Sequence, residues 1–242
     1  MLKELYEAIR GDAPAQELTI NGRKYTTSDV HSVYAPQPDT LEVSTLTGLV
    51  DYLKNNIDKL DIATLLCHVE SPTSVSIISK LQGDFEQRNA YIKAEARVRS
   101  LTFNKFMGSE EFNLWLQSCF VDTPLTVDGE LKATDKGLLL KYVGNVRDEQ
   151  VKTTGDDGIT QEVTVKVGVA SVANVVLPNP AILRPYRTFN EVTQPASAFV
   201  FRARTGPEFA LIEADNGAWE SEAMKSIKEF MGFEVEGLHV IA

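Results

Sequence analysis

The chain has 242 residues, of which 43% are hydrophobic and 24% charged, and this composition excludes a disordered, collagen-like or coiled-coil protein. Its 34 acidic residues outnumber 24 lysines and arginines, and the formal net charge of −10 opposes non-specific binding to DNA, RNA or anionic lipid. No stretch is apolar enough for a signal peptide or a membrane span, so we expect a cytoplasmic protein. Cys67 and Cys119 lie in apolar runs, which suits reduced, buried thiols.

The first third of the chain carries signals for a helix, a hairpin and a second helix. A short amphipathic helix is predicted over residues 2–10. The pair Asn21-Gly22 separates two alternating segments and predicts a hairpin over 18–26, because Asn-Gly accepts the positive φ angles of a type I′ turn. Apolar residues at helical spacing predict a helix over 45–60, with Ser44 as its N-cap.

The middle of the chain predicts an antiparallel meander followed by two helices. Three strands at 62–69, 74–79 and 90–98 are expected to present one face to solvent, because the last of them alternates polar and apolar residues. A helix over 110–120 places its aromatic residues on one stripe, and a weaker helix is predicted over 135–144.

From residue 149 onward the pattern indicates mainly strands. A long hairpin is expected with strands at 150–154 and 159–167 around the turn 155–158. Three prolines exclude a regular central strand over 177–189 and favour an extended edge or a connecting arm. The remaining predicted elements are strands at 198–204 and 208–214, an amphipathic helix that begins after Gly217 and stops at Gly232, and a final strand at 238–241.

These elements predict an α+β fold with mixed, largely antiparallel sheets, about three to four amphipathic helices and a long β-hairpin. Helices and strands alternate without a regular βαβ order, which argues against a doubly wound parallel sheet. No repeat or flexible linker divides the chain, so we expect residues 1–242 to form one compact unit, with a subdivision near 122–134 as the alternative.

Catalytic signatures are missing from the sequence. It contains no glycine-rich phosphate loop, dinucleotide-binding fingerprint, nucleophile elbow or H-E-x-x-H motif. His31, His68 and His239 lie far apart, and neither cysteine belongs to a C-x-x-C pair. We therefore assign no catalytic residue and no cofactor, and we expect a protein that is not an enzyme.

The densest group of acids surrounds the turn Asn216-Gly217 and comprises Glu213, Asp215, Glu220 and Glu222. Carboxylates from a strand end and the following helix can converge on Mg²⁺ or Ca²⁺, as a metal-dependent nuclease requires. Acids at the start of a helix also complement its dipole and keep the surface soluble. We favour this second interpretation and assign no metal site, with Glu213, Asp215 and Glu220 as the weak candidates.

The clearest positive signal is a set of arginines interleaved with aromatic residues: Arg184, Tyr186, Arg187, Phe189, Arg202 and Arg204. On the strand that begins at residue 198, the two arginines share one face and Phe199 and Phe201 take the other. Such a set can bind phosphates and stack bases. It can equally form a protein interface or pair with the acids of the C-terminal segment, within one subunit or head to tail between subunits. We favour pairing or an interface, because the net charge opposes nucleic acid.

The stretch 183–192, LRPYRTFNEV, and its continuation through Gln194-Pro195, Ser197 and 199–202 resemble the YfdQ-like family of bacteriophage and prophage proteins. The stretch 69–75 and the helix around Leu114-Trp115-Leu116 resemble the same family. The family has no assigned function, so the resemblance supplies no active-site residues. It implies a phage-encoded protein that acts in the host cytoplasm.

We therefore expect a non-enzymatic phage protein that self-associates and acts by binding, as an assembly component or as an antagonist of a host factor. Its expected partners are further copies of itself and a host or phage protein, with no membrane. The first alternative is a nucleic-acid-binding recombination or replication accessory protein that uses the arginine and aromatic set. The second alternative is a metal-dependent nuclease centred on the acids around residue 215.

Overall fold

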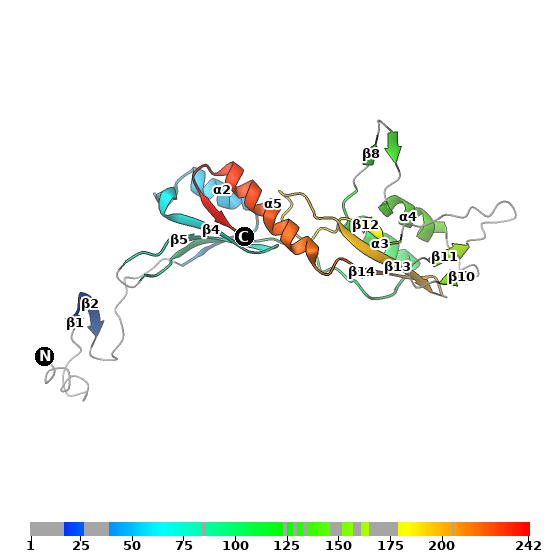
Figure 1. Cartoon of the computed structure of the whole chain (residues 1–242), viewed down its shortest axis with the longest axis horizontal. Coiled ribbons are helices and arrows are strands. Elements are labelled where there is room, and N and C mark those ends of the chain that lie inside the picture. Colours follow the sequence, from blue (N-terminus) through cyan, green and yellow to red (C-terminus); the bar gives the residue numbers. More distant parts are fainter. Residues whose placement is uncertain are drawn as a thin grey trace, which may run out of the picture.

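The α+β fold class predicted from the sequence is confirmed. The computed structural model describes residues 17–26, 39–83, 86–122, 125–127, 130–132, 135–145, 152–156, 161–164, 179–204 and 206–242. Their buried apolar side chains form two clusters, each between a sheet and its helices. We name the parts of the chain around these clusters the first and the second lobe, and Figure 1 shows them at opposite ends of an elongated molecule. The helix predicted over 2–10 lies outside the described residues.

The first lobe contains a five-stranded sheet in the order β15-β4-β5-β6-β3. Its elements are β3 (Leu41–Val43), α2 (Leu46–Lys54), the 3₁₀ helix η1 (Ile62–Thr64), β4 (Leu65–Ser71), β5 (Ser74–Ser79), β6 (Ala90–Glu95), α5 (Ala218–Glu234) and β15 (His239–Ile241). Strands β4, β5 and β6 form the predicted antiparallel meander. Strands β3 and β15 join its two edges in parallel, which no local pattern had indicated.

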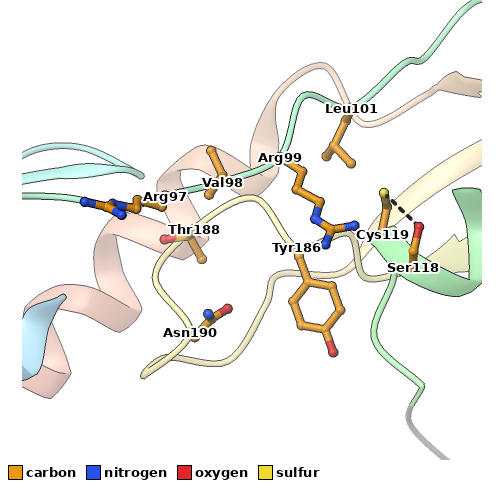
Figure 2. Close-up of a pocket in the computed structure, with 9 residues that line it drawn as sticks. All are labelled: Arg97, Val98, Arg99, Leu101, Ser118, Cys119, Tyr186, Thr188 and Asn190. Carbon is orange, nitrogen blue, oxygen red and sulfur yellow. Dashed lines mark hydrogen bonds between the residues drawn. The ribbon is translucent and has the colours of Figure 1, made fainter. Parts of the chain in front are cut away.

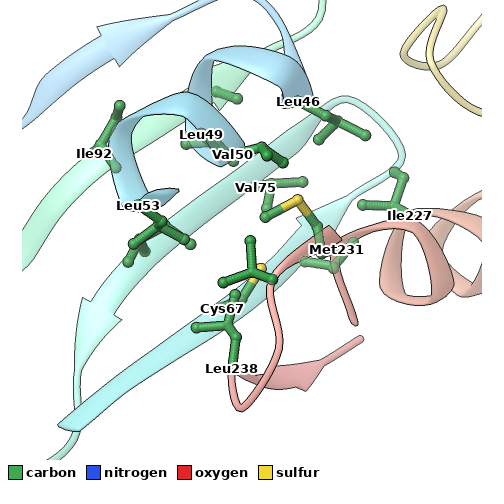
Figure 3. Packing of buried hydrophobic residues seen from close by; sticks show 14 of the residues in the cluster. Leu46, Leu49, Val50, Leu53, Cys67, Val75, Ile92, Ile227, Met231 and Leu238 are labelled. Carbon is green, nitrogen blue, oxygen red and sulfur yellow. The ribbon is translucent and has the colours of Figure 1, made fainter. Parts of the chain in front are cut away.

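Helices α2 and α5 pack on one face of this sheet (Figure 3). Helix α2 contributes Leu46, Leu49, Val50 and Leu53, which lie on one side of the helix because they recur at helical spacing. On β6, Ile92 is fully buried whereas Lys93 is partly exposed, so the strand alternates between core and solvent as predicted.

The second lobe contains a four-stranded sheet in the order β12-β13-β14-β7. Its elements are β7 (Met107–Gly108), α3 (Ser109–Cys119), α4 (Asp135–Asn145), β12 (Ala181–Leu183), β13 (Ser197–Arg204) and β14 (Glu208–Glu213). The core is rich in aromatic rings: Phe112 of α3 lies 5.7 Å from Phe209, whose ring stacks on Phe201 at 5.8 Å. Strand β12 is an edge strand, as the prolines around it predicted.

In the described part of the chain, three hairpins form separate two-stranded sheets that pair with neither larger sheet. They are β1 (Glu17–Ile20) with β2 (Arg23–Thr26), β8 (Leu125–Val127) with β9 (Glu130–Lys132), and β10 (Lys152–Asp156) with β11 (Gln161–Thr164). Asn21 and Gly22 have φ angles of 53° and 79°, so the predicted turn in the first hairpin is confirmed.

Three predicted helix boundaries are wrong. The helix predicted over 45–60 ends at Lys54, and its cap is Thr45, whose hydroxyl accepts the Gly48 amide at 3.1 Å, instead of Ser44. The C-terminal helix continues through Gly232 to Glu234. Val235 is its C-cap, and the glycine that follows the helix end in the left-handed conformation is Gly237 (φ 81°).

The turn of the third hairpin is also displaced from its predicted position. Gly155 and Asp156, expected in the turn, belong to β10 and pair with Glu162 and Gln161. The residues that connect β10 to β11, 157–160, lie outside the described residues. The sequence places a glycine on each side of two aspartates, and either end of that run satisfies local turn chemistry.

The chain passes between the lobes more than once. It enters the second lobe after β6, contributes Phe189 and Val192 to the first lobe between β12 and β13, and returns to the first lobe again with α5, so the first lobe consists of three separate stretches. The stretch 122–134, where a subdivision was the predicted alternative, contains β8 and β9. Both the single unit over 1–242 and this subdivision stay predictions. None of the described helices is long and apolar enough to cross a membrane.

The cap of α2 generates a first prediction. Thr45→Ala removes the acceptor for the Gly48 amide, so we expect the free energy of unfolding in urea to fall by about 1 kcal/mol. Ser44→Ala is the matched control and should change it by less than about 0.5 kcal/mol. A larger loss in Ser44→Ala than in Thr45→Ala would show that Ser44 is the cap, as the sequence predicted.

Candidate functional site

The stretch 184–197, which we name the junction segment, connects the cores of the two lobes. It leaves β12, whose Leu183 is buried in the second lobe, and places Phe189 and Val192 in the core of the first lobe. It then returns to the second lobe and continues into β13. Only five residues, 184–188, therefore separate a side chain in one core from a side chain in the other.

Hydrogen bonds between buried side chains and the backbone hold the segment in this path. The side-chain Oε1 of Gln194 accepts hydrogen bonds from the backbone amides of Arg187 at 3.0 Å and Thr188 at 3.2 Å. The side-chain Nε2 of Gln194 donates to the Phe189 carbonyl at 3.0 Å. The Thr188 hydroxyl donates to the carbonyl of Pro72, in the β4–β5 turn of the first lobe. The segment is thus fastened to itself and to the first lobe.

Arg187 lies at the centre of the junction, and its side chain is only 5% exposed. Its guanidinium donates to Glu213 at 2.6 Å and to the Ser197 hydroxyl, and it lies 3.9 Å from the Asp215 carboxylate. The same group lies 3.9 Å over the ring of Trp219, in the first turn of α5. One side chain therefore joins the junction segment, the end of β14 and the start of α5.

The electrostatic balance at Arg187 has two opposing causes. Burial lowers the pKa of the guanidinium, and the nearby carboxylates of Glu213, Asp215 and Glu220 raise it. Arginine remains charged throughout the physiological range, so the carboxylates compensate a buried positive charge. The Arg187 Nε finds no hydrogen-bond partner among the described residues.

The arginine and aromatic residues selected from the sequence do not form one surface. Arg187 and Phe189 are buried, whereas Arg184, Tyr186 and Arg204 are exposed. Arg204 binds Glu208 on the neighbouring strand at 2.5 Å and lies over the Phe106 ring, and Arg202 is half-buried on the same face of β13. Of the arginine and aromatic residues selected from the sequence, only Arg184 and Tyr186 are both exposed and part of the junction segment.

Pairing within one subunit, one of the two interpretations of the opposed charges, is what the geometry shows for Arg187 and Arg204. The carboxylates of Glu213 and Asp215 face the Arg187 guanidinium, and Asp215 also accepts the Gly217 amide at 3.3 Å. No group of three or more metal-ligating side chains is found across the described ranges, so Glu213, Asp215 and Glu220 do not assemble the metal site considered above.

A cleft of about 250 Å³ lies beside the junction segment (Figure 2). One wall belongs to the connection that follows β6, and the other to the junction segment and the end of α3. Its lining residues are Arg97, Val98, Arg99, Leu101, Ser118, Cys119, Tyr186, Thr188 and Asn190. Sequence reasoning singled out Tyr186 but missed Arg97 and Arg99, whose only local signal is the Arg-Val-Arg string after an alternating strand.

Comparison with protein families, curated proteins and solved structures finds no match to this chain. The resemblance to the YfdQ-like phage proteins therefore stays a prediction from the sequence. Its central string, LRPYRTF, coincides with the junction segment and the end of β12, so those residues have a structural role in joining the lobes.

The Arg187 contacts generate a second prediction. Arg187→Ala leaves Glu213 and Asp215 without their cation, and we expect the free energy of unfolding to fall by about 3 kcal/mol or more. Arg204→Ala breaks an exposed pair and should cost at most about 1 kcal/mol. Chemical denaturation followed by circular dichroism measures both, and equal effects would contradict the central role of Arg187.

The two cysteines generate a third prediction. Burial raises the pKa of the Cys67 thiol to about 12, so this thiol stays protonated at pH 8 and should resist iodoacetamide until the protein unfolds. Because the pKa of the Cys67 thiol is higher in the folded than in the unfolded protein, the protonated thiol contributes to the free energy of unfolding below pH 9. This contribution is lost as the pH rises from the ordinary value of 9 toward about 12. Cys119 lines the cleft and should react first, as mass spectrometry of timed samples would measure. Faster labelling of Cys67 would contradict the burial pattern.

Proposed function

We propose that the protein acts by binding, without catalysis, and that it self-associates through its hairpins. Following the resemblance, we propose a phage-encoded assembly component or an antagonist of a host factor in the host cytoplasm. The observation that carries the self-association is the set of separate hairpins β1–β2, β8–β9 and β10–β11, which pair with neither large sheet in the described part of the chain.

An isolated two-stranded hairpin is marginally stable in water, because each of its faces lacks a covering layer. In β1–β2, Leu18 pairs with Tyr25 across the strands, and Ile20 on the same face is 38% exposed. Figure 1 places this hairpin away from both lobes. A second copy of the chain would cover the apolar face and add a strand to an edge that pairs with no other described strand.

The contacts at the junction support a binding role over the two alternatives. The carboxylates that a nuclease would need face Arg187, where they compensate its buried charge. Two members of the set considered for nucleic acid are buried, Arg187 at the junction and Phe189 in the core of the first lobe. Arg187, Glu213 and Asp215 thus form contacts that stabilise the fold of one subunit.

The fourth prediction tests self-association directly. Light scattering after size-exclusion chromatography should give a discrete oligomer, and absorbance read at 260 and 280 nm corrects the mass for any bound nucleic acid. Leu18→Lys places a charge on the apolar face of β1–β2, so we expect this variant to elute as a smaller species or a monomer.

Thr19→Lys is the matched control, because it adds the same charge on the opposite, exposed face of the hairpin and should leave the mass unchanged. Both variants should keep the unfolding midpoint of the parent protein, since the hairpin lies outside both cores. A wild-type monomer at all micromolar concentrations would refute the proposal. An oligomer that Leu18→Lys leaves intact would refute the role of this hairpin.

A further inference from the structure

The cleft beside the junction is basic in a chain that is strongly acidic overall. Two arginines, Arg97 and Arg99, line it, and none of its described lining residues is an acid, although the chain has a net charge of −10. Both arginines are exposed and have no hydrogen-bond or ion-pair partner within the described residues. Arg187 and Arg204, by contrast, are both paired with glutamate. Arg97 and Arg99 therefore leave positive charge available to an anion.

Hydrogen bonds on its junction side hold the wall of the cleft in place. The Tyr186 amide donates to the Cys119 carbonyl at 2.9 Å, and the Val121 amide donates to the Arg184 carbonyl at 2.8 Å. The Thr188 hydroxyl, on the same junction segment, donates a hydrogen bond to the Pro72 carbonyl of the first lobe. This wall is thus fixed by both lobes, and a ligand would meet a preformed surface.

The side chains around the cleft differ in chemistry and orientation. Figure 2 shows Arg99 reaching toward Tyr186 and Cys119, whereas Arg97 extends away from the centre. Tyr186, a residue that is 40% exposed, adds an aromatic surface, and Ser118 and Asn190 add hydrogen-bonding groups. A guanidinium beside an exposed aromatic ring suits a ligand that carries an anionic group next to a planar one.

We propose that this cleft binds a nucleotide unit, with Arg99 as the main phosphate contact, Arg97 as a second contact and Tyr186 stacked on the base. Guanidinium groups bind phosphate oxygens through paired hydrogen bonds, and tyrosine rings stack on bases of any sequence. The volume of about 250 Å³ lies just below the range of about 300–1,000 Å³ usual for ligand sites, so the cleft would enclose part of such a unit and leave the rest in solvent. The unit comes either from a free nucleotide or from a single strand, and the two sources share the same chemistry.

The test is isothermal titration of the full chain at low salt with three probes: AMP, inorganic phosphate and a twelve-residue oligothymidylate. We expect AMP to bind and Arg99→Gln to weaken its binding about tenfold or more, because a charge-assisted hydrogen-bonding group is lost. Arg97→Gln should have a smaller effect. Tyr186→Ala should weaken the binding of AMP but leave the affinity for inorganic phosphate unchanged, since phosphate has no ring that could stack on the tyrosine.

The oligonucleotide distinguishes the two sources of the nucleotide. Binding of the oligothymidylate tighter than AMP, with the same dependence on Arg99, indicates a strand, and the reverse order indicates a free nucleotide. Bound ligand should also slow the alkylation of Cys119, which lines the same cleft. Arg99 is exposed, so its substitution should leave the unfolding midpoint unchanged.

Arg184→Gln is the matched control. Arg184 is an exposed arginine two residues from Tyr186 that does not line the cleft, so its substitution removes the same charge and should leave the affinity unchanged. An equal loss in Arg184→Gln and Arg99→Gln would overturn the proposal, because the binding would then follow overall charge. The absence of heat with all three probes would overturn it as well. These outcomes do not depend on the oligomeric state.

Discussion

The arrangement of the two lobes depends on one buried charge, the guanidinium of Arg187. Taking an arginine out of water is costly unless carboxylates and other hydrogen-bond acceptors surround it. Glu213, Asp215, Ser197 and the face of Trp219 supply these contacts, and they come from three different parts of the fold. Because the partners stabilise the charge only together, the end of β14, the start of α5 and the junction segment hold one relative position.

The fixed junction determines which surfaces remain for binding. The junction segment, with Phe189 in one core and Leu183 in the other, forms a wall of the cleft that contains Arg97 and Arg99. The hairpins lie outside this rigid arrangement and present strand edges of their own. The protein therefore offers two different surfaces, a preformed basic cleft and a set of separate β-hairpins, and each is suited to a different partner.

Local chemistry predicted much of the secondary structure and little of its assembly. The Asn21-Gly22 turn, the β4–β5–β6 meander and the two faces of β13 follow from turn residues and from alternation along single strands. The cap at Thr45 and the stop at Gly237 were missed because Ser44 and Gly232 satisfy the same local rules one or a few residues away. The parallel pairing of β3 and β15 was missed because their partners lie far away in the sequence.

The sequence by itself determined the fold class and the positions of most elements, because helical and strand periodicity and turn chemistry act over a few residues. Only the tertiary structure decided the role of each charged side chain. Arg187 and Arg99 look alike in the sequence, yet Arg187 is buried by carboxylates that lie 26 and 28 positions further along the chain. Arg99 remains exposed beside a cleft formed by segments that fold together from distant positions. Burial and charge compensation depend on such long-range contacts, which no local pattern specifies.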